Sequence, residues 1–68
     1  MNIIYTSDDE QVVVYKTDKG EFLATEKVGL GRRFLIRERK LFKAMRWLVK
    51  NHRITFEEYT RYTENKHV

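Results

Sequence analysis

The apolar residues in the first half of the chain fall into three short runs that are separated by polar turns. Residues 2–6, 11–17 and 21–27 are rich in β-branched and aromatic side chains, which favour strands. The tripeptide Asp18-Lys19-Gly20 between the second and third runs is typical of a hairpin, because glycine accepts the positive φ of a tight turn. Since the connections between neighbouring runs are short, we expect an antiparallel meander.

Residues 33–37 fit two patterns. Phe34 and Ile36 alternate with their neighbours, as they would in a fourth strand, but Phe34 also falls on the stripe of the helix that follows. We favour a short strand or extended segment here. The sheet is therefore expected within residues 2–37, with three or four strands.

Both faces of the second run are apolar near its middle. Val13 and Tyr15 share one face, while Val12 and Val14 share the other. A strand with two apolar faces suits the centre of a sheet. We expect a helix to cover one face and the other face to belong to a binding or self-association surface.

After residue 37 the apolar residues change to a helical period. Five of them recur at the spacing of one helix stripe: Leu41, Phe42, Met45, Leu48 and Val49. The stripe predicts a helix over about residues 38–51 that packs on the sheet. Glu38 suits its start and Arg53 its end, because the helix dipole favours an anion at the first turn and cations at the last.

A second helix is predicted over about residues 55–64. In the sequence Thr55-Phe56-Glu57-Glu58, the Thr55 and Glu58 side chains can each accept a hydrogen bond from the other's backbone amide, which is a capping box. Residues 51–53 are then a tight turn between the helices. The expected fold is α+β: a three- or four-stranded antiparallel meander followed by two helices, the first packed on the sheet.

The sequence Ile54-Thr55-Phe56-Glu57-Glu58-Tyr59 follows a helix that bears Leu48. The stretch from residue 48 to residue 59 resembles the SHOCT-type short helix pair, in which a Leu-bearing helix meets Ile-Thr-x-Glu-Glu-aromatic. Arg53 stands where the family has a glycine before Ile-Thr. The resemblance covers less than a third of the chain, and it implies an interaction or oligomerisation element without catalysis.

Length and composition exclude several classes of protein. A chain of 68 residues forms one small domain, which is marginally stable alone, so a partner or a second copy is a reasonable expectation. Without cysteine there is no disulfide, no thiolate zinc site and no cysteine nucleophile. His52 and His67 are too few and too far apart for a structural metal site, and we expect no cofactor. With no membrane-spanning run and no signal peptide, the chain is expected to be cytoplasmic.

The groups that could carry catalysis have simpler explanations. The acidic residues 8–10 lie in a predicted turn, and Glu57 and Glu58 belong to the start of a helix. The acidic residues 8–10 also lack the alternating ligands of a calcium loop. His52 falls in the turn between helices, where it more often satisfies helix carbonyls. Since no nucleophile or base has a positioned partner, we do not expect an enzyme.

The net charge of +4 is distributed very unevenly. Residues 1–31 hold three Lys against six Asp or Glu, whereas residues 32–53 hold nine Lys or Arg against Glu38 alone. A field of one sign attracts polyanions or an acidic protein. The competing interpretation is a solvated helix face that keeps a small protein in solution.

Nucleic-acid binding is the first functional hypothesis, with DNA favoured over RNA. A basic helix with an aromatic residue could enter a major groove, and Arg32 and Arg33 could reach a minor groove. The candidate residues are Arg32, Arg33, Arg37, Arg39, Lys40, Lys43, Arg46, Trp47 and Lys50. Trp47 has a second interpretation, as a core residue that packs on the second helix.

Protein binding is the alternative. Small, charged, non-enzymatic chains often act by docking on a larger host or cellular protein as modulators or inhibitors, as many phage-encoded and regulatory proteins do. The basic face could fit an acidic surface, or the chain could form a homodimer. Nucleic-acid binding should weaken steeply with salt, and this separates the two hypotheses.

Overall fold

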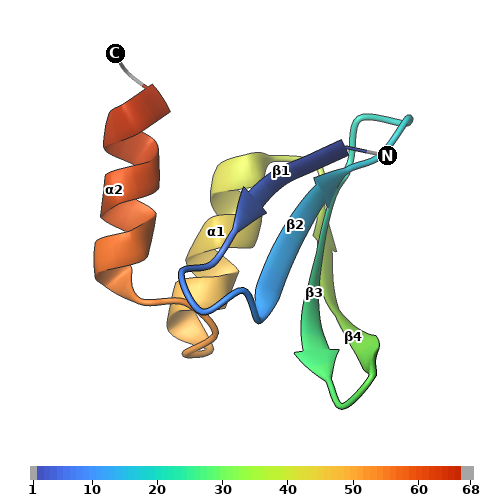
Figure 1. Cartoon of the computed structure of the whole chain (residues 1–68). Coiled ribbons are helices and arrows are strands. Elements are labelled where there is room, and N and C mark those ends of the chain that lie inside the picture. Colours follow the sequence, from blue (N-terminus) through green and yellow to red (C-terminus); the bar gives the residue numbers. More distant parts are fainter. Residues whose placement is uncertain (1, 67–68) are drawn as a thin grey trace.

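The computed structural model describes residues 2–66, with side chains described up to residue 64. In chain order its elements are β1 (Asn2–Thr6), β2 (Val12–Lys16), β3 (Phe22–Val28), β4 (Gly31–Glu38), α1 (Leu41–Lys50) and α2 (Phe56–Lys66). The strands form one four-stranded antiparallel sheet in the order β1-β2-β3-β4 (Figure 1). The expected α+β fold is confirmed, and the ambiguous segment before α1 is a fourth strand.

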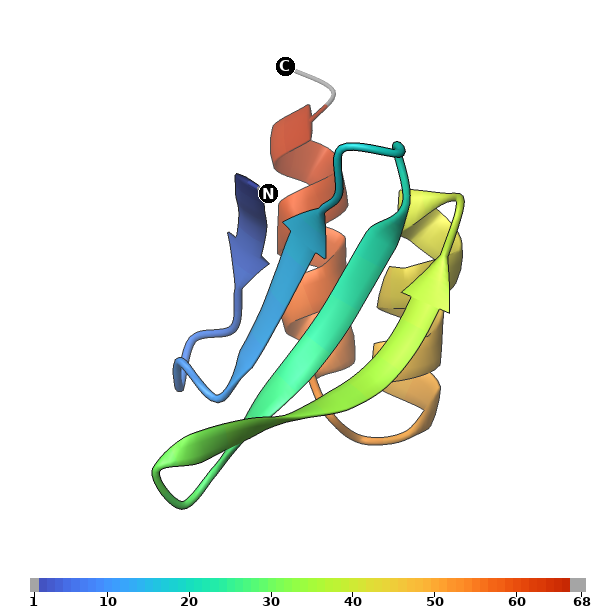
Figure 2. The ribbon, with the colours of Figure 1, turned by 90° about the vertical axis from the view of Figure 1, so that its right-hand side faces the viewer.

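Both helices lie on the same face of the sheet. α1 packs against β3 and β4, and α2 packs against α1. Tyr5 of β1 meets Tyr62 of α2 edge to face, with ring centres 5.1 Å apart. Figure 2 views the molecule from the right-hand side of Figure 1, where the helices lie behind the strands and the near face of the sheet carries no element of residues 2–66. The sheet therefore has one covered face and one open face.

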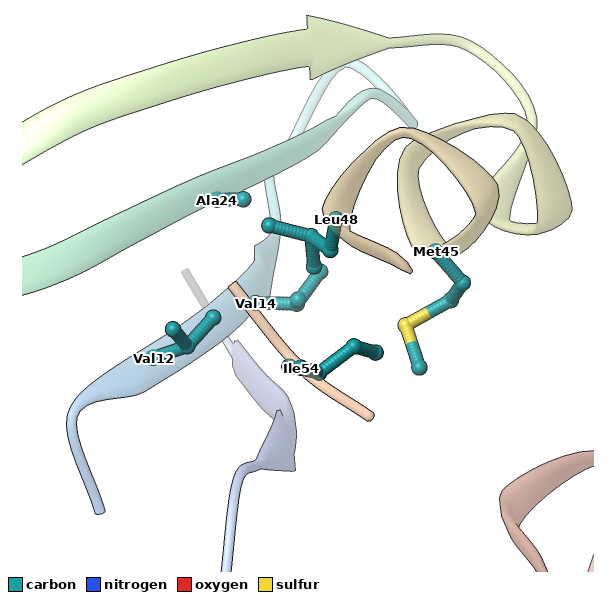
Figure 3. Packing of buried hydrophobic residues seen from close by; sticks show 6 residues of the cluster. All are labelled: Val12, Val14, Ala24, Met45, Leu48 and Ile54. Atoms are coloured by element: carbon teal, nitrogen blue, oxygen red, sulfur yellow. The ribbon is translucent and has the colours of Figure 1, made fainter. Parts of the chain in front are cut away.

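The core lies between the covered face and α1. Its buried side chains come from β2, β3, α1 and the link between the helices (Figure 3): Val12, Val14, Ala24, Met45, Leu48 and Ile54. Val14 pairs with Ala24 across the sheet, which places both on the face that meets the helix. Burying an aliphatic side chain fully is worth about 1.5–3 kcal/mol. This small cluster is therefore the main source of stability that the strands and α1 share.

The first helix begins three residues later than the sequence predicts. Glu38 was expected to open the helix, but it is the last residue of β4 and pairs with Phe22 of β3. An extended backbone held in a ladder cannot also make the first helical turn. Lys40 is the N-cap instead, in an extended conformation with ψ of 129°, and no acidic residue lies in the first turn.

The buried side of α1 is also centred on residues that differ from those that the sequence predicts. Ala44 is fully buried, whereas Phe42 is 46% exposed. Since α1 starts at Leu41 and packs through Met45 and Leu48, the residue next to Leu41 points about 100° away from that contact. The expectation that Phe42 belongs to the core stripe was wrong, and Phe42 is a surface residue.

The capping box at the start of α2 is present. The Thr55 hydroxyl accepts a hydrogen bond from the Glu58 amide at 3.0 Å, and the Glu58 carboxylate accepts one from the Thr55 amide at 3.0 Å. The helix continues to Lys66, two residues beyond the predicted end. In the part of the chain that the structure describes, no helix has the length and apolar character needed to cross a bilayer.

A two-residue turn joins β3 to β4. Val28 pairs with Gly31 at the end of the ladder, so that Gly29 and Leu30 form the tip of the hairpin. Gly29 has a φ of +58°, and no atom lies within 4 Å of where its Cβ would be. Leu30 is fully exposed. The tip therefore extends into solvent beyond the packed part of the fold.

Candidate nucleic-acid interface

The outer face of α1 carries three cations. Lys43, Arg46 and Lys50 are all exposed, and they recur every three or four residues along a helix of 10 residues. Such spacing places side chains on one side of a helix. The buried residues Ala44, Met45 and Leu48 occupy the other side. The predicted basic helix face is therefore present for these three residues.

Two aromatic side chains lie among these cations. Phe42 and Trp47 line a shallow surface hollow of about 260 Å³ together with Lys43, Arg46 and Lys50. Glu38, at the end of β4, is the one carboxylate that lines it. We call this set the α1 hollow: Glu38, Phe42, Lys43, Arg46, Trp47 and Lys50. It combines positive charge with apolar ring surface in one place.

Trp47 has features of both roles that the sequence suggests, a surface binding residue and a core residue. It is half-buried and packs against the core cluster, and it also lines the α1 hollow. A tryptophan held in this way is fixed by the core while part of its ring remains accessible. Phe42, which the sequence assigned to the core, is the more exposed aromatic residue of the hollow.

The cations of the hollow are not neutralised by carboxylates of the described part of the chain. The ion pairs found there use other arginines: Arg33 and Arg53 with Glu26, and Arg61 with Asp8. Lys43, Arg46 and Lys50 have no carboxylate oxygen within 4 Å among residues 2–64. Their charge is therefore available to an external anion.

The structure divides the nine candidate residues among three places. Lys43, Arg46, Trp47 and Lys50 meet in the α1 hollow. Arg39 and Lys40 are exposed in the link before α1, and the remaining three lie on β4: Arg32, Arg33 and Arg37. The nine residues do not form one continuous helix face, because β4 extends to residue 38 and takes its arginines into the sheet.

Two of the β4 arginines make contacts within the fold. Arg33 donates two hydrogen bonds to the Glu26 carboxylate, one of them from Nε at 3.0 Å. Arg32 donates from Nε to the Thr25 hydroxyl and from Nη2 to the Gln11 carbonyl, each at 2.9 Å. Arg33 thus has a structural role on the covered face, while Arg32 lies on the open face.

The carboxylate of Glu26 is a feature that sequence reasoning did not identify. Glu26 is 9% exposed, and its second partner is Arg53, whose Nη1 donates to Oε2 at 3.0 Å. The three residues come from β3, β4 and the turn after α1. No local pattern signals the contact, because Arg53 lies 27 residues from Glu26.

The groups with clearly shifted pKa values lie away from the α1 hollow. Among the described residues, these groups are found where β1 and the turn after it meet α2: Tyr5, Asp9, Glu58 and Arg61. The Ser7 hydroxyl, and then the Gln11 amide, lower the pKa of Asp9. Asp8 raises the pKa of Arg61, to which it is paired at 2.9 Å.

Glu58 joins the start of α2 to β1. Burial alone would raise the pKa of Glu58, but the amides of Asp8 and Thr55 and the hydroxyls of Thr55 and Tyr5 outweigh it, so that the pKa is lowered. The Asp8 amide donates to Oε2 at 2.8 Å, and the Tyr5 hydroxyl donates to the same oxygen at 3.2 Å. Burial, and then the charge of Glu58, raise the pKa of Tyr5 well above its usual range. These shifts have structural causes, and they do not mark the α1 hollow as a site of proton transfer.

Among the described residues, no three His, Asp or Glu side chains come close enough together to hold a metal ion. The stretch that resembles the SHOCT-type helix pair forms the end of α1, the turn and the start of α2. Comparison of the chain with protein-family models, with curated proteins and with solved structures finds no match.

Proposed function

We propose that the protein is a small non-enzymatic regulator that binds nucleic acid, DNA in preference to RNA, through the α1 hollow. The observation that carries the proposal is the set of cations Lys43, Arg46 and Lys50, which pair with no carboxylate of residues 2–64, around two accessible aromatic rings. Phosphate contacts supply most non-specific affinity for DNA, and each neutralised phosphate releases counterions. The cations would take the phosphates, and Phe42 and Trp47 would pack on sugars or bases.

The geometry of α1 is compatible with this role. A helix of 10 residues is about 15 Å long, and a major groove about 12 Å wide admits one helix. The side of α1 that holds Lys43 and Lys50 faces away from the sheet. The exposed Arg39 and Lys40, at the start of the helix, would add phosphate contacts next to the hollow.

The test is a salt-titrated gel shift with duplex DNA, single-stranded DNA and RNA, from about 50 mM to about 200 mM salt. We expect binding that weakens steeply with salt. The double substitution Lys43→Glu/Lys50→Glu should abolish binding at about 150 mM salt, because it reverses two charges of the hollow. Absence of binding to all three nucleic acids at about 50 mM salt would refute the proposal.

The matched control is Lys16→Glu/Lys19→Glu. Both lysines are exposed, on β2 and in the turn after it, and neither of them lines the hollow. The two double variants carry the same net charge, so a loss confined to the α1 variant would assign binding to the hollow. An equal loss in both would mean that the total charge of the protein is responsible.

The alternative function is docking on an acidic protein surface, as a modulator or inhibitor. It is favoured by the same hollow, since Trp and Arg are the residues that most often anchor protein interfaces, and Trp47 and Arg46 lie together there. This alternative predicts no affinity for oligonucleotides at about 150 mM salt, where the Debye length is about 8 Å. A homodimer, the further possibility that the SHOCT resemblance supports, would be detected by size-exclusion chromatography.

A further inference from the structure

The open face of the sheet carries large apolar side chains. The pairing registers place four of them there: Ile3, Tyr15, Leu23 and Phe34. They pair across the strands on the side opposite to the core residues Val14 and Ala24, which is the face that Figure 2 shows free of helices. Phe34 is 54% exposed and Ile3 is 61% exposed. Exposed aromatic and aliphatic side chains that gather on one face mark a binding surface more often than isolated ones do.

Cations surround these apolar residues. The register places Arg37 next to Leu23, and Arg32 next to Lys27. The ladder pairs no Asp or Glu on the open face, because Glu26 and Glu38 point to the covered side, and Glu21 lies just before the start of β3, at the margin of the sheet. The open face is therefore positive and partly aromatic, in contrast to the acidic turn at residues 8–10.

One of the cations is already held in position. Arg32 reaches from β4 across β3 to the residue before β2, because Nε donates to the Thr25 hydroxyl and Nη2 donates to the Gln11 carbonyl. It nevertheless remains exposed, and its Nη1 has no hydrogen-bond partner in residues 2–64. A guanidinium fixed in this way binds an anion with less loss of side-chain entropy than a free one.

The charge of this face decides between possible ligands. A dimer formed through this face would place Lys27, Arg32 and Arg37 of one copy near the same cations of the other copy. Repulsion between like charges disfavours such a dimer. A DNA duplex offers phosphates and base edges, but its stacked bases offer no free ring faces. A single strand offers both phosphates and unstacked bases, and these pack on aromatic side chains of open sheets.

We propose that the open face is a second binding site, for single-stranded nucleic acid. Bases stack on Phe34 of β4 and on Tyr15 of β2, and the phosphates bind Lys27, Arg32 and Arg37. The two aromatic residues lie two strands apart, about 10 Å, so they take bases of different nucleotides. The inference goes beyond the function proposed above, because it concerns the other side of the sheet and does not depend on α1.

Fluorescence anisotropy with labelled single strands of about 12 nucleotides, as DNA and as RNA, tests the proposal beside a duplex of the same length. Phe34→Ala should weaken single-strand binding by about 5- to 150-fold, the fold-change that corresponds to about 1–3 kcal/mol for one stacked base. The dependence on salt should be unchanged, because no phosphate contact is removed. Phe34→Trp, which keeps a stacking surface, should restore binding.

The control is Phe56→Ala. Phe56 is 69% exposed on α2, on the other side of the molecule, so its removal deletes an equally accessible ring away from the open face. The proposal is overturned if Phe34→Ala and Phe56→Ala bind single strands as well as the unchanged protein does. It is also overturned if Phe34→Ala weakens duplex binding as much as single-strand binding. Circular dichroism of each variant shows that the fold persists.

The two proposals fail in different ways. If Lys43→Glu/Lys50→Glu removes all binding while Phe34→Ala removes none, the α1 site stands and the open-face site is rejected. If Phe34→Ala removes single-strand binding while the α1 variant keeps both single-strand and duplex binding, the open face is the site and the proposal for α1 is rejected. Lys27→Glu/Arg37→Glu should lower the salt dependence of single-strand binding, since two phosphate contacts are lost.

Discussion

Arg53 donates a hydrogen bond of 3.0 Å to the carboxylate of Glu26, and so connects the turn after α1 to the third strand of the sheet. Arg33 binds the other carboxylate oxygen from β4. Glu26 thus joins three segments: β3, β4 and the turn after α1. Glu26 is nearly buried, while both arginines are partly exposed. We therefore expect each ion pair to contribute less to stability than a fully buried pair but more than a surface pair.

We therefore expect Glu26→Gln to lower the free energy of unfolding by about 1–2 kcal/mol, since three charge-assisted hydrogen bonds are weakened. Urea denaturation followed by circular dichroism measures the change. Asp8→Asn is the control, because it breaks the Arg61 pair, in which both side chains are more than half exposed. It should have the smaller effect, and equal effects would contradict the role given to burial.

Glu58 is expected to make stability depend on pH in the acid range. Its folded-state pKa is lower than the ordinary value of 4.5, so the unfolded chain binds its proton first as the pH falls. The contribution of Glu58 to the free energy of unfolding is therefore complete when the pH is above the ordinary pKa. It is lost as the pH falls through the lowered pKa of the folded state. Urea denaturation between about pH 6 and pH 3 should show a smaller loss of stability in Glu58→Gln than in the unchanged protein.

The control for this pH dependence is Glu57→Gln. Glu57 is an exposed neighbour on the same helical turn, but none of the hydrogen bonds that join α2 to β1 and Asp8 uses its side chain. Its substitution should leave the acid-range slope unchanged. A Glu57→Gln slope that matches that of Glu58→Gln would show that general helix-end charge, and not the Tyr5 and Asp8 contacts, causes the effect.

The two apolar residues Leu48 and Phe42 should differ sharply when truncated. Leu48 is fully buried, so Leu48→Ala should cost about 2–5 kcal/mol in the free energy of unfolding. Phe42 is 46% exposed, so Phe42→Ala should cost less than about 1 kcal/mol. If Leu48→Ala does not fold, the milder Leu48→Val gives the same ranking. Similar costs at both positions would place Phe42 in the core after all.

Trp47 offers an optical readout of the α1 hollow, because it is the only tryptophan in the chain. Its ring lines the hollow while it packs on the core. A ligand bound there should change the intrinsic tryptophan fluorescence, and Lys50→Glu should suppress the change. A ligand bound to the open face should leave Trp47 unaffected, because α1 lies on the other side of the sheet.

The sequence predicted the fold well where local patterns decide the structure. Three predicted features are present: the Val-rich strand, the hairpin at Gly20, and the capping box of Thr55 and Glu58. Each of them depends on residues that are only a few positions apart in the sequence. The start of α1 was missed because Glu38 suits a helix end by charge but is held in the sheet by its pairing with Phe22. That pairing spans 16 residues and has no local signal.

The candidate site was predicted in part for the same reason. Periodicity placed Lys43, Arg46 and Lys50 on one side of a helix, and the structure agrees. It could not show that Phe42 joins them, because Phe42 lies at the edge of the apolar stripe and Ala44, on the other edge, is the residue that is buried. Nor could charge counting show that Arg33 is committed to Glu26, since ion pairs across a sheet depend on register.

The exposed tip at Leu30 has a practical use. The sequence contains no cysteine, so Leu30→Cys gives the protein a single thiol at the end of the β3–β4 hairpin. A fluorophore attached there has room, since Leu30 is fully exposed and the adjoining Gly29 has no neighbouring atoms at its Cβ position. The molecule thus provides its own labelling position at a loop that tolerates change, and a dye there would report tumbling without occupying the α1 hollow.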